Sequence, residues 1–201
     1  MTYLNKSVII IDNSDLSYSG EDINGPVVRG TETSLILLSE QFIRMGINVD
    51  YCNTIQKKNK VNGVNYFNKN DIIKKKQYDL AIVISDANEF RRISSLKKAV
   101  FSNSNQPIEK FIRKKQLLPF LKYKPTLITL CDYQYKKRSF FTSFYGKKTI
   151  PITVDPKFLD IEIDQNFLPE KKVVYNIRSN RNLNHLIKIW CDKIFPINND
   201  F

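Results

Sequence analysis

Two unbroken apolar runs constrain the fold of this chain more than any other feature. The first, Val8 to Ile11, lies in the segment Ser7 to Asp12, and the second, Leu80 to Ile84, lies in the segment Tyr78 to Ser85. Neither shows the strict apolar–polar alternation of a strand with one face in water, so each predicts a strand that is buried on both faces. Strands of this kind occur in parallel sheets that are covered by helices on both sides.

After a polar loop from Asn13 to Gly30, the segment that ends at Gly46 predicts a helix. Its apolar residues repeat at helical spacing, namely Leu35, Leu38, Phe42 and Met45. Thr31 is placed to cap the start, Glu32 suits the positive first turn, and Gly46 is expected to end the helix. A short strand, Asn48 to Tyr51, should follow, which gives a strand–loop–helix–strand unit.

The same alternation continues to about residue 150. Three further strands are expected at Ala99–Ser102, Thr126–Leu130 and Lys148–Ile150. Helices are expected at 108–117 and from Asp132, as the capping residue, to Gly146. Alternating strands and helices predict an α/β fold, a Rossmann-like parallel sheet flanked by helices, with the carboxyl ends of its strands along one edge.

The composition changes near Pro151, where a proline-rich connector begins. We expect a first domain over residues 1–155, a connector over 156–170, and the start of a second domain over 171–201. The last part predicts one strand, Lys172 to Tyr175, and one helix whose apolar stripe centres on Trp190. One strand and one helix cannot bury their own apolar faces, so this second domain is expected to be truncated.

Composition narrows the classes of function. Apolar runs of four or five residues are far shorter than the roughly 20 that a membrane helix needs, and no signal-peptide pattern opens the chain, so a cytoplasmic protein is expected. The three cysteines are scattered, which argues against a zinc site or a disulfide framework.

The net charge of +12 could attract nucleic acid or anionic lipid. Lysine pairs recur along the whole chain rather than in one cluster, as the codon bias of an AT-rich genome would produce. This spread of lysines argues against a nucleic-acid partner.

The common catalytic fingerprints are absent. The chain has no G-x-G-x-x-G, phosphate-loop, H-E-x-x-H or G-x-S-x-G motif, and its only histidine, His185, lies off the apolar stripe of the last helix. A Ser-His-Asp triad is thereby excluded. What remains is the Gly30-Thr31-Glu32 loop that leads into a helix N-terminus. It could hold an anion such as a diphosphate, or it could be an ordinary capped loop.

Three segments, in order, resemble the retaining GT-B glycosyltransferases. Gly30-Thr31-Glu32 through Gly46-Ile47-Asn48-Val49 is similar to the family's glycine-rich loop, helix and strand. The stretch from Ile150 to Phe158 resembles the interdomain I-P-N-G-V-D-x-x-x-F, with Ile152-Thr153 in place of Asn-Gly. Lys172-Val173-Val174-Tyr175 and Arg178-Ser179-Asn180-Arg181-Asn182-Leu183 resemble the opening of the donor-binding domain, with Asn182 in place of glycine.

The resemblance implies a glycosyltransferase of two Rossmann-like domains, in which the first holds a carbohydrate or lipid-linked acceptor and the second a nucleotide-sugar donor. It implies no cofactor and no metal. The candidate donor- and acceptor-binding residues are Gly30, Thr31, Glu32, Asp86, Asn105, Arg178 and Arg181. Asp86 or Asn105 would take the place of the family's sugar-site histidine, and Arg178 or Arg181 would face the leaving diphosphate.

The same resemblance implies two further expectations. The first domain should make peripheral contact with anionic membrane, and the chain should bind donor weakly because the family's acidic donor motif is absent. Two other readings stay open from the sequence. One is a non-catalytic Rossmann-like relic of a glycosyltransferase, and the other is a basic nucleic-acid-binding module.

Overall fold

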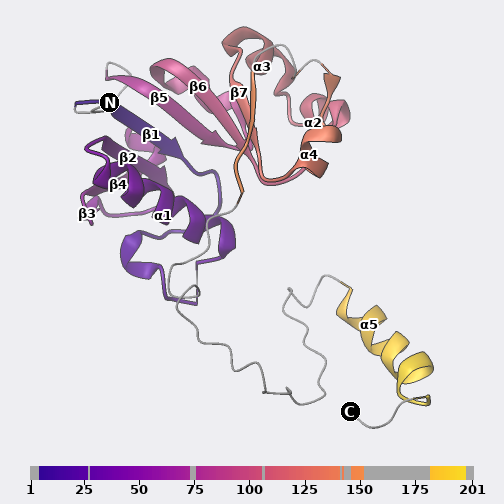
Figure 1. The fold of residues 1–201 in the computed structure, drawn as a ribbon. Coiled ribbons are helices and arrows are strands. Elements are labelled where there is room, and N and C mark those ends of the chain that lie inside the picture. Colours follow the sequence, from indigo (N-terminus) through magenta and orange to yellow (C-terminus); the bar gives the residue numbers. More distant parts are fainter. Residues whose placement is uncertain are drawn as a thin grey trace. The chain divides into compact units, whose positions relative to one another are not determined.

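A twisted sheet runs through the first part of the chain (Figure 1). The computed structural model describes residues 5–26, 28–72, 76–105, 107–140, 142, 146–151 and 182–197. The chain divides into two compact units, Met1–Phe158 and Leu159–Phe201. The first unit holds the sheet, and the described residues of the second form one helical segment.

Eight strands form the sheet in the described part of the chain, in the order β3-β4-β2-β1-β5-β6-β7-β8. Every neighbouring pair is parallel except β3 with β4. The expected parallel α/β sheet is therefore confirmed, and all six expected strands of the first unit belong to it. The strands are β1 (Ser7–Ile11), β2 (Asn48–Asn53), β3 (Asn59–Val61), β4 (Val64–Asn68), β5 (Gln77–Ile84), β6 (Ser94–Ser102), β7 (Thr126–Thr129) and β8 (Lys147–Thr149).

Helices cover both faces of this sheet, which explains why the central strands are apolar without alternation. On one face, Ile10 of β1 packs in a core with Leu35 and Ile36 of α1 (Gly30–Arg44). On the other face, Ile9 and Ile11 share a core with residues of η3 (Ala87–Arg92), α2 (Ile108–Arg113) and α3 (Leu117–Tyr123). Each fully buried Ile or Leu contributes roughly 1.5–3 kcal/mol to stability.

Helix α1 begins two residues earlier than expected, and this changes the role of Thr31. The N-cap is Arg29, whose side chain makes no capping hydrogen bond, so Thr31 lies inside the first turn and the expected Thr31 cap is wrong. The C-terminal expectation is confirmed. Gly46 has a φ of 79°, and its N–H donates to the carbonyl oxygen of Ile43 at 2.9 Å. Glycine adopts this left-handed conformation at little cost.

Two of the expected helices differ in length. The helix expected over 108–117 ends at Arg113, Lys115 takes a φ of 53°, and α3 then starts at Leu117. The helix expected from Asp132 to Gly146 is described only as α4 (Asp132–Lys136), with Cys131 rather than Asp132 at the N-cap. Periodicity alone does not show that a helix is divided, because the apolar spacing survives a short turn.

A β-hairpin and two short 3-10 turns were not expected from the sequence. Strands β3 and β4 are joined by Asn62 and Gly63, whose φ values of 48° and 86° suit a two-residue hairpin turn. A Cβ at position 63 would lie 2.7 Å from Cγ2 of Ile43, so the turn also packs against α1. Short 3-10 turns, η1 (Gly20–Asp22) and η2 (Lys69–Asp71), complete the loops of this region.

The second unit contributes α5 (Leu183–Ile189), which continues into the π-helical turn η6 (Trp190–Ile194). Within the described residues 182–197, neither element has a buried residue, and Ile187 is 50% exposed. The strand expected at Lys172–Tyr175 lies outside the described residues, as does the connector expected over 156–170.

Asp50 is a buried carboxylate on β2 whose hydrogen bonds should make stability depend on pH. It is 7% exposed and accepts hydrogen bonds from Lys76 Nζ at 2.5 Å, Tyr78 Oη at 2.7 Å and Asn65 Nδ2 at 3.0 Å. Burial alone would raise the pKa of Asp50. The three hydrogen bonds outweigh it and hold the pKa below its ordinary value of 3.8.

We expect Asp50→Asn to lower the free energy of unfolding by about 1–3 kcal/mol at neutral pH. Because the folded pKa is depressed, the stabilisation is complete above the unfolded pKa and is lost as the pH falls through the folded pKa. Thermal unfolding from neutral pH to about pH 2 should therefore show the gap between wild type and Asp50→Asn closing in acid. Asp15→Asn, at an exposed carboxylate, serves as the control. A gap that is constant with pH would contradict the prediction.

Candidate functional site

A polar cleft lies where the strand order of the sheet reverses. From β1 the chain proceeds through α1 to β2 on one side, while β5 lies on the other side of β1 and leads on to β6 (Figure 1). In open α/β sheets, ligands bind at such a switch point, outside the carboxyl ends of the strands. A cavity of about 400 Å³ occurs here, lined by Asp12, Asn13, Ser14, Arg29, Thr31, Glu32, Ile84, Ser85, Asp86, Asn103 and Lys114. We call it the switch-point cleft.

Another cavity, of about 370 Å³, lies beside β2 and β4 and is a weaker candidate. Its central carboxylate, Asp50, already accepts hydrogen bonds from Asn65, Lys76 and Tyr78. A carboxylate with three protein donors has little capacity left for a ligand. The polar groups of this cavity therefore stabilise β2 through Asp50 rather than indicating a ligand site.

The carboxyl end of β1 places a buried acid in the switch-point cleft. Asp12 is 4% exposed, and its carboxylate accepts hydrogen bonds from the backbone N–H of Ser14 at 2.9 Å, from Ser14 Oγ at 2.7 Å and from Tyr18 Oη at 2.6 Å. The Asp-Asn-Ser sequence forms this turn because a short carboxylate can bond the backbone two residues ahead. These bonds hold Asp12 in one orientation.

A pair of buried tyrosines extends the hydrogen-bond network of Asp12. The hydroxyl of Tyr18 also hydrogen-bonds that of Tyr51, whose ring is fully buried in β2. Burial is the main cause that raises the pKa of both phenols above the ordinary value, with the negative charge of Asp12 adding to it. Both tyrosines are therefore neutral hydrogen-bonding groups at any physiological pH.

The N-terminus of α1 supplies a second buried acid. Glu32 is 6% exposed, and its Oε2 atom has no hydrogen-bond partner among the described residues. The Nδ2 atom of Asn13, also lining the cleft, is buried and without a partner in the same part of the chain. Buried polar atoms are normally paired, so an acceptor and a donor left open in one cleft indicate a place for a polar ligand.

Gly30 leaves open space at this helix start. A Cβ built at Gly30 would have no atom within 4 Å, so packing does not require glycine there. Space above a helix N-terminus gives a ligand access to backbone N–H groups. The expectation that a ligand could approach the backbone at Gly30 and Thr31 remains a prediction, and the geometry leaves room for it.

A strained turn follows the carboxyl end of β5 and lines the cleft. Ser85 has a φ of 58°, which is uncommon for a residue other than glycine. Gln116, 3% exposed, holds the turn because its Nε2 donates to the Ser85 carbonyl oxygen at 3.1 Å and its Oε1 accepts from the Ala87 N–H at 3.3 Å. Asp86 follows, and its Oδ1 accepts from Asn88 N at 2.9 Å. Strain that the surroundings hold in place is frequent at functional sites.

The polar groups of the cleft favour a hydroxyl-rich ligand. Three carboxylates face two cations, Arg29 and Lys114, and amide and hydroxyl groups fill most of the remainder. Carboxylates and amides accept and donate the hydrogen bonds that sugar hydroxyls offer. Among the residues that the structure describes, no three His, Cys, Asp or Glu side chains come together as a metal site would require.

The structure brings together some of the residues predicted from the sequence. Thr31, Glu32 and Asp86 line the same cleft, and Gly30 lies between two lining residues. Asn105 does not line it, and its backbone oxygen instead accepts a hydrogen bond from Lys110 Nζ at 3.4 Å. Arg178 and Arg181 lie outside the described residues.

Several cleft residues were missed by sequence reasoning. Asp12 and Asn13 follow a buried strand directly, and that position at the sheet edge was a usable signal. Arg29, Ser85 and Lys114 carry no comparable signal, because each reaches the cleft only through the fold.

Within the described ranges, no helix has the length and apolar character to cross a membrane. No family model, curated protein or solved structure matches this chain.

Proposed function

We propose that the first unit is the acceptor-side domain of a glycosyltransferase, and that the switch-point cleft binds the carbohydrate portion of the acceptor through its hydroxyl groups. The unpartnered, buried Oε2 of Glu32 carries this proposal. An open acceptor on a buried carboxylate is costly unless a donor reaches it, and a sugar hydroxyl is a donor of the right size.

The other polar groups of the cleft fit the same ligand. Asn13 Nδ2 would donate to a ring or hydroxyl oxygen of the sugar, and Asp86 would accept from a second hydroxyl. Arg29 and Lys114 would meet an anionic part of the acceptor, such as the diphosphate of a lipid-linked sugar. Pairing several hydroxyls at once would fix which of them points out of the cleft.

Transfer itself would depend mainly on this positioning. In a nucleotide-sugar donor, bound by the second domain, the bond from the anomeric carbon to the nucleoside diphosphate would break as the acceptor hydroxyl oxygen bonds to that carbon. The hydroxyl proton would pass to the departing diphosphate. Holding the two reactants together in the correct orientation removes a large entropic part of the barrier. The pairing of Glu32 with a hydroxyl next to the reacting one would supply that orientation on the acceptor side.

Glu32→Gln is expected to weaken carbohydrate binding by about tenfold, because an amide accepts a hydroxyl hydrogen bond less strongly than a carboxylate. The test is saturation-transfer NMR of the 201-residue chain with a panel of neutral mono- and oligosaccharides, followed by affinity titration of those that bind. Since Oε2 has no protein partner, the variant should unfold at or above the wild-type temperature.

Glu40→Gln, on the same helix but outside the cleft, is the matched control and should bind like wild type. Equal affinity of Glu32→Gln and wild type, or no binding by any sugar of the panel, would refute the acceptor site. Sugar binding with no transfer from any nucleotide-sugar would instead favour the non-catalytic relic.

A further inference from the structure

A groove lies on the sheet face that α1 covers only in part. Leu80 of β5, Ala99 of β6 and Ile128 of β7 belong to the same core cluster as the apolar residues of α1. The main contacts of α1 with the sheet are with β2 and β4, which lie toward the other end of the strand order. Leu80 and Ile128 are therefore only half-buried, and with Ala99 they line a cavity of about 560 Å³. We call it the lysine groove.

Four lysines line this groove together with the apolar side chains. Lys97 and Lys98 belong to β6, Lys124 follows α3, and Lys148 belongs to β8. Lys98 Nζ donates a hydrogen bond to the carbonyl oxygen of Ser95 at 2.7 Å. Within the described ranges no acidic residue lines the groove, and none of its four lysines forms an ion pair. Cations gathered in this way attract an anionic partner.

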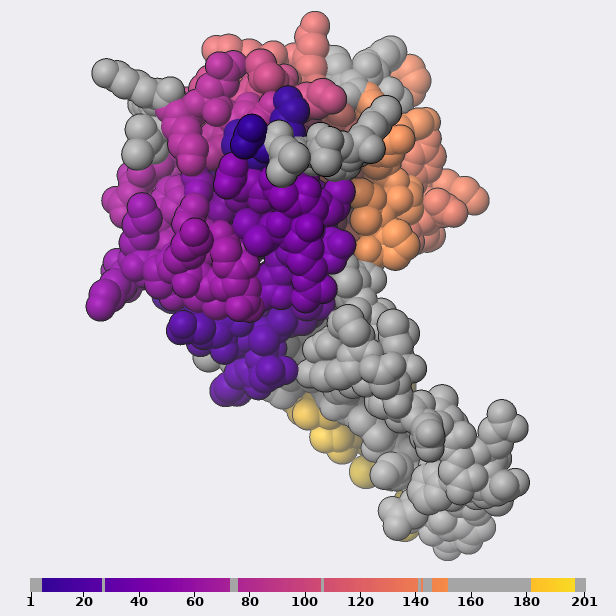
Figure 2. Space-filling model, turned by 60° about the vertical axis from the view of Figure 1, so that its left-hand side comes forward, coloured from indigo at the N-terminus to yellow at the C-terminus, as the bar shows by residue number. Residues whose placement is uncertain are grey.

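The sequence around the groove does little to neutralise these lysines. Residues 93–151 contain 13 Lys and Arg but only 2 Asp and Glu, a net charge of +11 out of the +12 of the whole chain. The two acids are Glu109 and Asp132, and neither lines the groove. In Figure 2 this stretch, coloured pink to orange, lies toward the top and right of the first unit. The positive charge of the chain is thus concentrated in the part of the sheet that forms the groove.

The backbone at Lys124 is strained, which is a separate sign of function. Lys124 ends α3 with a φ of 47°, a left-handed conformation that glycine adopts at lower cost. Its N–H donates to the carbonyl oxygen of Phe120 at 2.9 Å and so holds the turn. Strain that the surroundings hold in place is frequent at binding sites. Here it occurs at a charged residue that lines the groove.

We propose that the lysine groove binds an acidic segment of a partner protein. Apolar side chains of the segment pack on Leu80, Ala99 and Ile128, while its carboxylates pair with the surrounding lysines. An apolar centre with a charged rim is the usual arrangement of a protein–protein interface. Opposite charges across such an interface speed association and select the partner. This proposal does not depend on what the switch-point cleft binds.

Two other occupants fit the groove less well. The bases of a single-stranded nucleic acid stack on aromatic rings, and Tyr123 is the one aromatic side chain among the described residues that line the groove. A second copy of this chain, docked groove to groove, would bring the same four lysines against each other. Like charges placed together in an interface are strongly unfavourable.

The test is titration of a dye-labelled peptide with the 201-residue chain, followed by fluorescence anisotropy. The peptide has about ten residues, with leucines at its centre and glutamates on both sides, to match an apolar centre and a charged rim. A peptide with glutamine for each glutamate should bind at least about tenfold more weakly. A peptide with serine for each leucine should also lose about tenfold. Affinity for the acidic peptide should fall about tenfold or more between low and high salt.

Two pairs of lysines separate the groove from the overall charge. Lys97→Gln/Lys148→Gln, at two exposed positions that line the groove, should weaken binding about tenfold or more. Lys136→Gln/Lys137→Gln removes the same charge from the same basic stretch but outside the groove, and should weaken binding less than about twofold.

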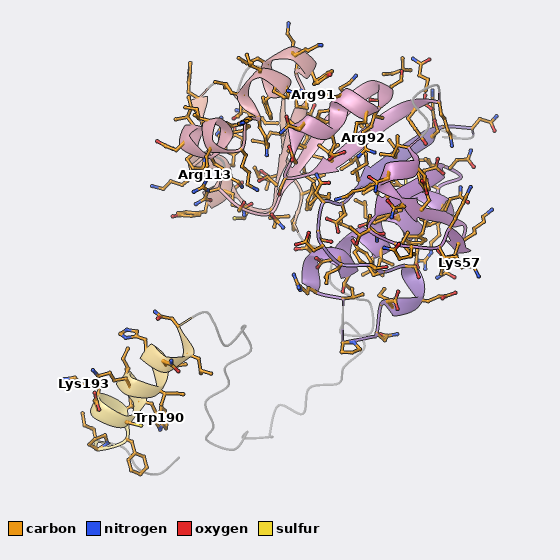
Figure 3. All side chains as sticks on the ribbon, turned by 180° about the vertical axis from the view of Figure 1, so that it is seen from behind. Lys57, Arg91, Arg92, Arg113, Trp190 and Lys193 are labelled. Carbon is orange, nitrogen blue, oxygen red and sulfur yellow. The ribbon has the colours of Figure 1, made fainter. Side chains whose placement is uncertain are left out.

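A third pair tests the effect of distance. Lys57→Gln/Lys58→Gln removes the same charge between β2 and β3, and should also weaken binding less than about twofold. Figure 3 shows Lys57 at the opposite end of the first unit from Arg113 of α2.

Lys124→Gly separates binding from folding. The variant should unfold at a higher temperature than wild type, because glycine adopts a φ of 47° more readily, yet it should bind the acidic peptide about threefold more weakly or worse. Leu96→Ser tests an apolar side chain that lines the groove and is 67% exposed, and should weaken binding about threefold. Leu118→Ser, at a side chain that is 75% exposed and outside the groove, should bind like wild type.

Three results would overturn the proposal. The first is equal loss of affinity from the groove lysines and from either control pair, or equal binding of the glutamine peptide. The second is tighter binding of a single-stranded oligonucleotide than of the acidic peptide. The third is a dimer in sedimentation velocity that Lys97→Gln/Lys148→Gln alters, because a second copy would then cover the groove.

Discussion

Tyr18→Phe is expected to lower the free energy of unfolding by about 2–4 kcal/mol, although it removes a single oxygen atom. That hydroxyl is buried, donates to the Asp12 carboxylate at 2.6 Å and hydrogen-bonds the hydroxyl of Tyr51. Its loss leaves a buried charge and a buried phenol each short of a partner. Urea unfolding followed by far-ultraviolet circular dichroism measures the change.

Tyr66→Phe is the matched control, because the two tyrosines differ mainly in hydrogen bonding. Tyr66 is also fully buried, and its ring packs against that of Tyr51, but its hydroxyl has no partner among the described residues. Removing an unpaired buried hydroxyl should leave stability unchanged or slightly raised. If both variants lost the same stability, ring packing rather than the Asp12 network would be the cause.

Gln116→Ala should cost about 2–4 kcal/mol as well, through the backbone rather than through a side-chain network. The variant leaves the Ser85 carbonyl oxygen and the Ala87 N–H without their partner, beside a residue already held at a φ of 58°. The turn that carries Asp86 should then relax, so affinity of the switch-point cleft for its ligand should fall together with the unfolding temperature.

Gln56→Ala provides the comparison for Gln116→Ala. Gln56 is exposed and makes one hydrogen bond, from Nε2 to the carbonyl oxygen of Thr54 at 3.2 Å, so its loss should change stability by less than about 0.5 kcal/mol. Thermal unfolding of both variants and ligand titration of the cleft are the measurements. A Gln116→Ala protein as stable as wild type would show that the turn holds its own conformation.

The sheet was predictable because burial on both faces leaves a strong signal in the chain. The apolar runs of β1 and β5 predicted central parallel strands, and the structure places them side by side. The hairpin of β3 and β4 was missed even though Asn62-Gly63 is a strong turn signal, because its strands are short and rich in asparagine. Helix α3 was not expected either, although Pro119 lies in its first turn, where a proline removes no helical hydrogen bond.

The candidate site was less predictable than the fold. Thr31, Glu32 and Asp86 were found because a helix start and a strand end are local features of sequence. Gln116 and Tyr51 were missed because their roles depend on partners that are distant in the chain, namely Ser85 and Tyr18. No periodicity or spacing reports such pairings, which arise only when the sheet brings the segments together.

The two outermost strands bear on how this protein behaves when it is concentrated. In the described part of the chain, β3 and β8 end the sheet, each is three residues long, and both carry lysine, at Lys60, Lys147 and Lys148. A short edge strand with positive charges repels the edge strand of another molecule and offers few unpaired backbone groups for hydrogen bonding. Edge-to-edge pairing of sheets into fibrils should therefore be slow at neutral pH. Acetylation of these lysines removes their charge and should accelerate it.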